Sequence, residues 1–109
     1  MPEFHLPACT AQEALRRPNA HLIDVRREAA LQASGKIVAD ARWIDPLALD
    51  HRHDVLRARK PLIFYCAHGH EISQFAAALA LLHKCDACFV RHGFAALVDA
   101  GAPLSEVLP

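Results

Sequence analysis

The chain has 109 residues, enough for one domain with a buried core but too few for two. Its 12 lysine and arginine residues balance 12 aspartate and glutamate residues, so no global field would steer nucleic acid to the surface. Apolar residues make up 53% of the sequence, yet no apolar run is long enough to span a bilayer. We therefore expect a single domain over residues 1–109 that binds neither nucleic acid nor membrane.

The amino terminus bears on the expected compartment, and the compartment on the expected state of the cysteines. Residues 1–5 contain neither a basic segment nor an apolar signal segment, so a cytoplasmic location is expected. In that compartment the cysteines are predicted to be thiols rather than a disulfide framework. They are Cys9, Cys66, Cys85 and Cys88.

Helix and strand signals alternate from the start of the chain. Thr10 and Glu13 have the spacing of a capping box, which predicts a short helix ending near Arg17. The apolar run 21–25 then predicts a buried strand, with Asp24 at its carboxyl end.

The next stretch is less periodic. A brief helix is expected over residues 26–32 and a short strand over 41–44. Pro46 is a suitable first residue for a further helix, whose charged side over residues 50–60 would face solvent. Its inner side is predicted to carry Leu47, Leu49, Val55 and Leu56.

The second half repeats the alternation more clearly. Strands are predicted at Leu62–Tyr65 and Ala87–Val90, and helices at Gln74–Leu82 and Phe94–Ala100, with Gly101 closing the last helix. Strands that alternate with helices form parallel β-α-β units with right-handed crossovers. The expected fold class is α/β, with a small, mostly parallel sheet flanked by helices on both faces.

Cys66 lies where one of these strands ends and the next loop begins. Chemistry in open α/β sheets gathers at the carboxyl ends of strands. Taken alone, Cys66 has two interpretations, an inert buried thiol or a nucleophile, because reactivity depends on its surroundings.

Several segments, in order and spacing, resemble the rhodanese-like (sulfurtransferase) domain over nearly the whole chain. They are residues 22–26 (LIDVR), 35–41 (GKIVADA), 63–69 (IFYCAHG), 90–94 (VRHGF) and 100–103 (AGAP). The resemblance implies a three-layer rhodanese-like fold and a sulfane sulfur carried as a persulfide on Cys66, with no cofactor. The partners it implies are a small-molecule sulfur donor and a thiol or cyanide-like acceptor, or a protein persulfide.

The sequence also departs from the family pattern. Glu71 stands where the family loop has arginine, and Ile72 stands where it has serine. His92 replaces the first glycine of a glycine pair, and Leu97 falls where tryptophan is usual. The related phosphatases need the loop arginine to grip phosphate, so the sequence argues against a phosphatase.

Sulfur transfer requires a thiolate, and the loop can favour one without a particular charged side chain. Backbone amides of residues 67–72 can point inward as an anion-binding nest, and the following helix presents its positive end. Gly69 permits the positive φ that such a curl requires. The predicted active-site loop after Cys66 is Ala67, His68, Gly69, His70, Glu71, Ile72 and Ser73.

The polar side chains near this loop each have alternative roles. His68 and His70 either place positive charge near the sulfur or project into solvent. Glu71 either stabilises the first helical turn or repels an anionic donor such as thiosulfate. Ser73 is expected to bond to the backbone at the helix start. Asp24 and Arg26 are expected to brace the neighbouring loops rather than to transfer protons.

Two competing functions remain open at this point. Cys66-x-His68-x-His70 and Cys85-x-x-Cys88 contain zinc-type ligands, but there is no second Cys-x-x-Cys, so we expect no metal site. Cys9 has no evident partner. The second functional hypothesis is a catalytically weak rhodanese-like module that binds a partner or senses redox state through Cys66.

Overall fold

The main sheet contains five parallel strands in the order β1-β6-β5-β2-β4. The computed structural model describes residues 6–57 and 59–107. The strands of this sheet are β1 (Ala8–Cys9), β2 (His21–Asp24), β4 (Arg42–Trp43), β5 (Leu62–Tyr65) and β6 (Ala87–Val90). A second sheet pairs β3 (Lys36–Val38) with β7 (Leu104–Glu106) in antiparallel fashion.

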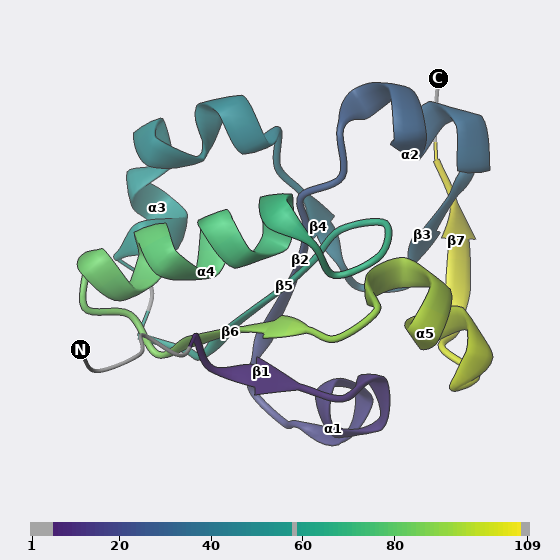
Figure 1. Ribbon diagram of the computed structural model, residues 1–109, viewed down its shortest axis with the longest axis horizontal. Coiled ribbons are helices and arrows are strands. Elements are labelled where there is room, and N and C mark those ends of the chain that lie inside the picture. The colour runs from purple at the N-terminus through teal and green to yellow at the C-terminus, as the bar shows by residue number, and fades with distance from the viewer. Residues whose placement is uncertain (1–5, 58, 108–109) are drawn as a thin grey trace.

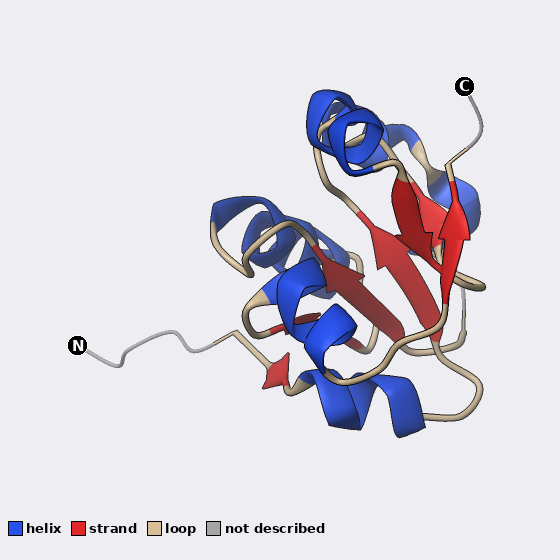
Figure 2. Cartoon of the chain, turned by 90° about the vertical axis from the view of Figure 1, so that its right-hand side faces the viewer, coloured by secondary structure: helices blue, strands red, loops and turns tan. Residues whose placement is uncertain are grey.

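Helices cover both faces of the main sheet (Figures 1 and 2). Leu62 and Phe64 pack in a cluster with residues of the helices on one face, whereas Ile63 and Tyr65 pack with the helices on the other. The first face carries the 3-10 helix η1 (Pro46–His51), α3 (His53–Leu56) and α4 (Glu71–Leu82). The second carries α1 (Ala11–Arg16) and α5 (Gly93–Asp99), while α2 (Glu28–Ser34) packs against β3. The predicted three-layer α/β architecture is confirmed.

Two helix ends have the capping hydrogen bonds that the sequence predicted. Thr10 and Glu13 form the reciprocal capping box at the start of α1, with both bonds at 3.1 Å. At the end of α5, Gly101 adopts φ of +86° and its amide donates to Val98 O. The next amide donates to Leu97 O, which completes a Schellman motif.

The prediction of one continuous helix from Pro46 was wrong. The segment divides into η1 and the single turn of α3, and Leu47 is 88% exposed although it was expected to face inward. Residues two apart do not share a face of a helix, so Leu47 and Leu49 could not both point at the core. Leu49 is the buried one of the two, and Val55 and Leu56 are buried as predicted.

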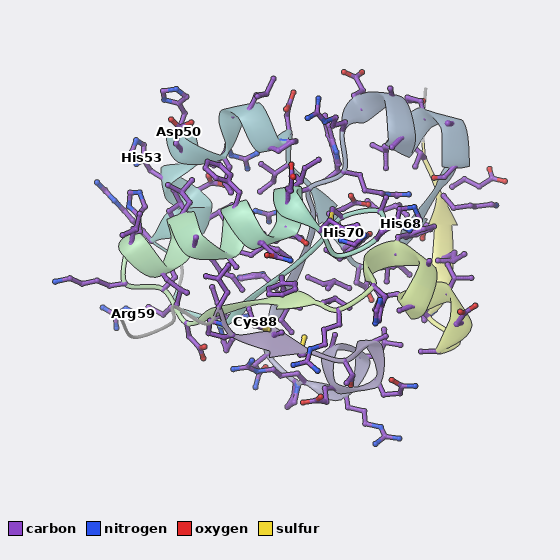
Figure 3. All side chains as sticks on the ribbon, viewed as in Figure 1. Asp50, His53, Arg59, His68, His70 and Cys88 are labelled. Atoms are coloured by element: carbon purple, nitrogen blue, oxygen red, sulfur yellow. The ribbon has the colours of Figure 1, made fainter. Side chains whose placement is uncertain are left out.

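Other differences concern short elements and boundaries. β1, β3 and β7 were not predicted, and α4 begins at Glu71, three residues earlier than expected. Of the charged side chains predicted to face solvent between residues 50 and 60, Arg52 is half-buried and the others are exposed as predicted. Figure 3 shows Asp50, His53 and Arg59 at the rim of the molecule. Within the described residues, no helix has both the length and the apolar character needed to cross a membrane.

Candidate active site

Cys66 follows β5 directly and has its sulfur on the α4 face of the sheet. The residue is only 4% exposed and belongs to the same cluster as Phe64 and Ala77. Alternation along β5 explains this placement, because every second residue of a strand faces the same side. The loop from Ala67 to His70 then curls back to the amino terminus of α4.

Three carbonyl groups between Cys66 and Gly69 accept hydrogen bonds from donors outside this segment. Phe94 N donates to Cys66 O at 2.8 Å, and Ala95 N donates to Ala67 O at 3.4 Å. These are amides of the first turn of α5, which have no partner within their own helix. Gln74 Nε2 donates to Gly69 O at 3.1 Å. With the carbonyls held outward, the loop's amides are available to face the sulfur.

Two glycines allow the loop and α5 to meet backbone to backbone. Gly69 has φ of +75°, and a Cβ there would lie 2.5 Å from His92 N. Gly93 has φ of +57°, and a Cβ there would collide with Cys66 O. Any larger side chain at either position would push the loop away from α5.

The environment of the sulfur favours a thiolate. Burial raises the pKa of the Cys66 thiol, but the Ser73 hydroxyl and the backbone amides of Ser73, Gly69 and His68 together lower it below the ordinary value. Cys66 Sγ lies 3.1 Å from Ser73 Oγ, and Ser73 is fully buried. The prediction that Ser73 bonds to the backbone was wrong. Because α4 starts at Glu71, Ser73 lies in its first turn with its hydroxyl next to the sulfur.

The histidines of the loop line the entrance to the sulfur. His68 and His70 are both exposed, with ring centroids 6.4 Å apart (Figure 3). A hollow of about 490 Å³, which we call the inner hollow, opens here. Its lining residues are Arg26, Arg27, Ala30, Cys66, Ala67, His68, His70, Glu71 and Ile72.

Asp24 and Arg26 form a buried ion pair beneath this hollow. Arg26 Nη2 lies 2.8 Å from Asp24 Oδ2 and also donates to Lys36 O at 2.7 Å. Arg26 Nη1 donates to Ser34 Oγ at 3.0 Å, and the guanidinium lies 4.0 Å from the centroid of the Phe94 ring. The pair therefore ties the end of β2 to α2, β3 and α5. Its opposite charges neutralise each other, so it offers little net charge to a substrate.

Several residues of this site were not predicted, among them Ala30 in the lining of the inner hollow. Arg27 lines the inner hollow, Gln74 holds a loop carbonyl, and Gly93 and Phe94 dock the loop on α5. The signal for Arg27 was its position in the short connection after β2, at the same sheet edge as Cys66. The signal for Gly93 was the surviving second glycine of the family's pair.

The remaining cysteines do not converge on Cys66. Cys85 Sγ donates to Leu56 O at 2.9 Å, and burial raises its pKa. Cys88 faces the opposite side of the sheet, where its sulfur lies 3.5 Å from that of Cys9. Cys9 thus has a partner, because β1 pairs with β6, a strand pairing that was not predicted. Among the described residues, no group of three His, Cys, Asp or Glu side chains could hold a metal ion.

Comparison with known proteins agrees with the class defined by this fold and cysteine loop. Residues 8–100 match the family model of the rhodanese-like domain. The chain belongs to the rhodanese-like domain family. No curated protein matches the sequence.

Solved structures with low sequence identity share the fold. A rhodanese-related protein from Thermoplasma volcanium has 20% identity and a TM-score of 0.76, covering 91% of this chain and 97% of its own. A thiosulfate sulfurtransferase from Pseudomonas aeruginosa has 18% identity and a TM-score of 0.74, covering 94% of this chain and 20% of its own. A protein of unknown function from Rhodopseudomonas palustris, described as a possible tyrosine phosphatase, has 20% identity and a TM-score of 0.80, covering 92% of this chain and 85% of its own.

Proposed function

We propose that this protein is a sulfurtransferase that carries a sulfane sulfur as a persulfide on Cys66. The observation that supports this most strongly is geometric: the Cys66 thiol is buried at the end of β5, with its sulfur 3.1 Å from the buried Ser73 hydroxyl. Burial raises the pKa of that thiol, and hydrogen bonds from Ser73 and from the amides of Gly69 and His68 act to lower it. A thiolate is the reactive form of cysteine, and stabilising it by hydrogen bonds raises its fraction at neutral pH.

The reaction has two steps. In the first, the Cys66 thiolate attacks the sulfane sulfur of the donor, whose S–S bond breaks, and the donor remainder leaves with the electron pair. In the second, an acceptor thiolate attacks the outer sulfur of the Cys66 persulfide, and Cys66 leaves as a thiolate. The loop amides and the Ser73 hydroxyl stabilise the anionic sulfur at the start and end of this cycle.

Glu71 makes the inner hollow less favourable to a small anionic donor than the family's arginine at this position would. Glu71 lines it at the end of the loop, and residues 67–73 contain no arginine. Arg26 is neutralised by Asp24, which leaves Arg27 as the exposed guanidinium of the lining. A neutral low-molecular persulfide or a protein persulfide is repelled less by the Glu71 carboxylate than thiosulfate is. A missing loop arginine also weighs against phosphate chemistry.

Intact mass after exposure to a sulfur donor tests the proposal. The protein is incubated with thiosulfate, or with a low-molecular persulfide, and we expect a gain of one sulfur atom. The gain should disappear in Cys66→Ser and persist in the control Cys85→Ser. If neither donor adds sulfur, the protein is better described as a module that binds a partner or senses redox state.

Charge reversal at the loop tests the role of Glu71. We expect Glu71→Arg to raise turnover of thiosulfate, because a like charge near the donor becomes an opposite one. Steady-state rates with thiosulfate measure this effect. Glu106→Arg provides the control, since it makes the same charge change at an exposed site on β7. A rate for Glu71→Arg at or below that of the unmodified protein would count against this role.

A further inference from the structure

Large apolar side chains are exposed beside the inner hollow. Leu47 on η1 is 88% exposed, and Phe75 on α4 is 58% exposed. They belong to a second hollow of about 550 Å³, here called the outer hollow. Its lining residues are Arg27, Glu28, Asp45, Pro46, Leu47, Glu71, Ile72 and Phe75. Exposed apolar groups gathered at one place on a small protein mark a surface that a partner covers.

The outer hollow is continuous with the catalytic centre. It shares Arg27, Glu71 and Ile72 with the inner hollow, which reaches Cys66. A molecule that approaches the sulfur from this side therefore passes over Leu47 and Phe75. With volumes of about 550 and 490 Å³, the two hollows together are far larger than cyanide or a two-carbon thiol, so a small acceptor would leave the apolar end uncovered.

The charge around the outer hollow further restricts the chemical class of molecule that could bind there. Its lining contains three carboxylates, from Glu28, Asp45 and Glu71, and one guanidinium, from Arg27. The Asp45 carboxylate also accepts from Leu47 N at 2.9 Å and is held at the rim. A net negative rim around an apolar floor suits an occupant that is both apolar and cationic.

We propose that the outer hollow binds a cysteine-containing segment of a sulfur-acceptor protein, with apolar side chains on Leu47 and Phe75 and a lysine or arginine near Glu28 and Glu71. This inference rests on the proposed sulfur transfer at Cys66 and names its acceptor class. The segment's cysteine enters the inner hollow as a thiolate and attacks the outer sulfur of the Cys66 persulfide. The persulfide S–S bond breaks, a new S–S bond forms on the segment, and the Cys66 thiolate is released to the loop amides.

Two synthetic peptides with blocked ends test the acceptor class. One is the cationic and apolar sequence Leu-Lys-Cys-Lys-Leu, and the other is the acidic and polar sequence Ser-Glu-Cys-Glu-Ser. Protein already loaded with sulfane sulfur is mixed with each peptide at matched thiolate concentration, and persulfidated peptide is followed by mass spectrometry. We expect the first peptide to react about tenfold faster, a ratio that corresponds to about 1.4 kcal/mol. Equal rates, or a preference for the acidic peptide, would overturn the inference.

Surface variants locate the effect. The double variant Leu47→Ser with Phe75→Ser should lose the preference for the first peptide and keep its rate with 2-mercaptoethanol. Leu82→Ser is the matched control, because Leu82 is an 81% exposed leucine at the other end of α4. The inference fails if the double variant keeps the preference or if Leu82→Ser loses it equally.

Binding without chemistry separates this inference from the proposed function. A fluorescent peptide with serine in place of cysteine is titrated with unloaded protein, and anisotropy gives the dissociation constant. We expect the double variant to bind about tenfold more weakly than the Leu82→Ser control. If Cys66 takes up no sulfur, the proposed function fails while this binding result still stands. Sulfur uptake without selective peptide binding, or a dimer that the double variant abolishes, would overturn the acceptor surface alone.

Discussion

The position of Ser73 shows how one side chain contributes to the reactivity of another. Its hydroxyl is fully buried and lies 3.1 Å from Cys66 Sγ. The hydroxyl can accept from the thiol and can donate to the thiolate after the proton leaves. Burial penalises the charged sulfur, so each hydrogen bond to that charge has a large effect.

Replacing this hydroxyl should slow the chemistry of Cys66. We expect Ser73→Ala to reduce the rate of Cys66 alkylation by iodoacetamide about tenfold at pH 7, since a hydrogen bond to a charged group contributes about 1.5 kcal/mol. The rate is measured by mass spectrometry of the Cys66 peptide. Ser105→Ala, at an exposed position of β7, is the control and should react like the unmodified protein.

The pH profile of the same alkylation reaction gives the direction in which the Cys66 pKa is shifted. Burial raises the pKa of Cys66, but the stronger combined hydrogen bonding lowers it, so the thiolate persists to lower pH than in an ordinary cysteine. The alkylation rate should therefore rise with pH and level off below the range of an unperturbed thiol. Ser73→Ala should move that midpoint to higher pH. A midpoint unchanged by the substitution would contradict the assigned role.

At the scale of elements, the junction between β6 and α5 governs the shape of the loop. His92 and Gly93 both adopt left-handed backbone conformations, with φ of 63° and 57°. Gly93 needs this freedom because Cys66 O lies against it. His92 has no such freedom, since a side chain in the left-handed region costs roughly 1–2 kcal/mol. The family's glycine at this position would avoid that strain.

His92→Gly should therefore stabilise the protein. The relief of strain exceeds the extra entropy of glycine in the unfolded chain, so we expect a net gain of roughly 0.5–1 kcal/mol. Urea denaturation measures the free energy of unfolding. Arg91→Gly, at the neighbouring exposed residue without a positive φ, should lower stability. A loss of stability in His92→Gly would show that the histidine side chain makes a compensating contribution.

The elements that were predicted correctly have strong local signals. β5 and β6 are uninterrupted apolar runs, and α1 has its capping box at Thr10. β1, β3 and β7 have two or three residues each, too few to show alternation. Such short strands form because a neighbouring strand offers unpaired backbone groups. Because that neighbour is distant in the sequence, the local residues do not reveal the pairing. The early start of α4 has a related cause, since Glu71 and Ile72 look like loop residues until the curl of the loop is known.

At the scale of the whole molecule, Arg26 connects parts that are distant in the sequence. It joins the end of β2 to α2 and, through Lys36 O, to the second sheet. The side chain is 3% exposed, and its backbone oxygen accepts from Trp43 Nε1. The sequence showed an Asp-x-Arg pair at a strand end but not the second sheet, so most of these bonds could not be predicted.

Removing the Arg26 guanidinium should destabilise the protein severely. Arg26→Met leaves the Asp24 carboxylate buried without its partner, which costs about 3–5 kcal/mol. That is a large part of the 5–15 kcal/mol typical of small domains. Thermal and urea unfolding measure the loss. Arg42→Met removes a guanidinium from an exposed ion pair with Asp54 and should cost about 1 kcal/mol or less. Similar losses in the two variants would contradict this account.

The way the loop is anchored has a consequence for how its sequence can vary. Its carbonyl groups are fastened by amides of α5 and by Gln74, and its close contacts require Gly69 and Gly93. Positions 68, 70 and 71 contribute outward-facing side chains, and none of them fastens a carbonyl. Randomising these three codons should therefore change the lining of the inner hollow while the position of Cys66 is retained, which makes the fold a convenient starting point for directed evolution of this binding site.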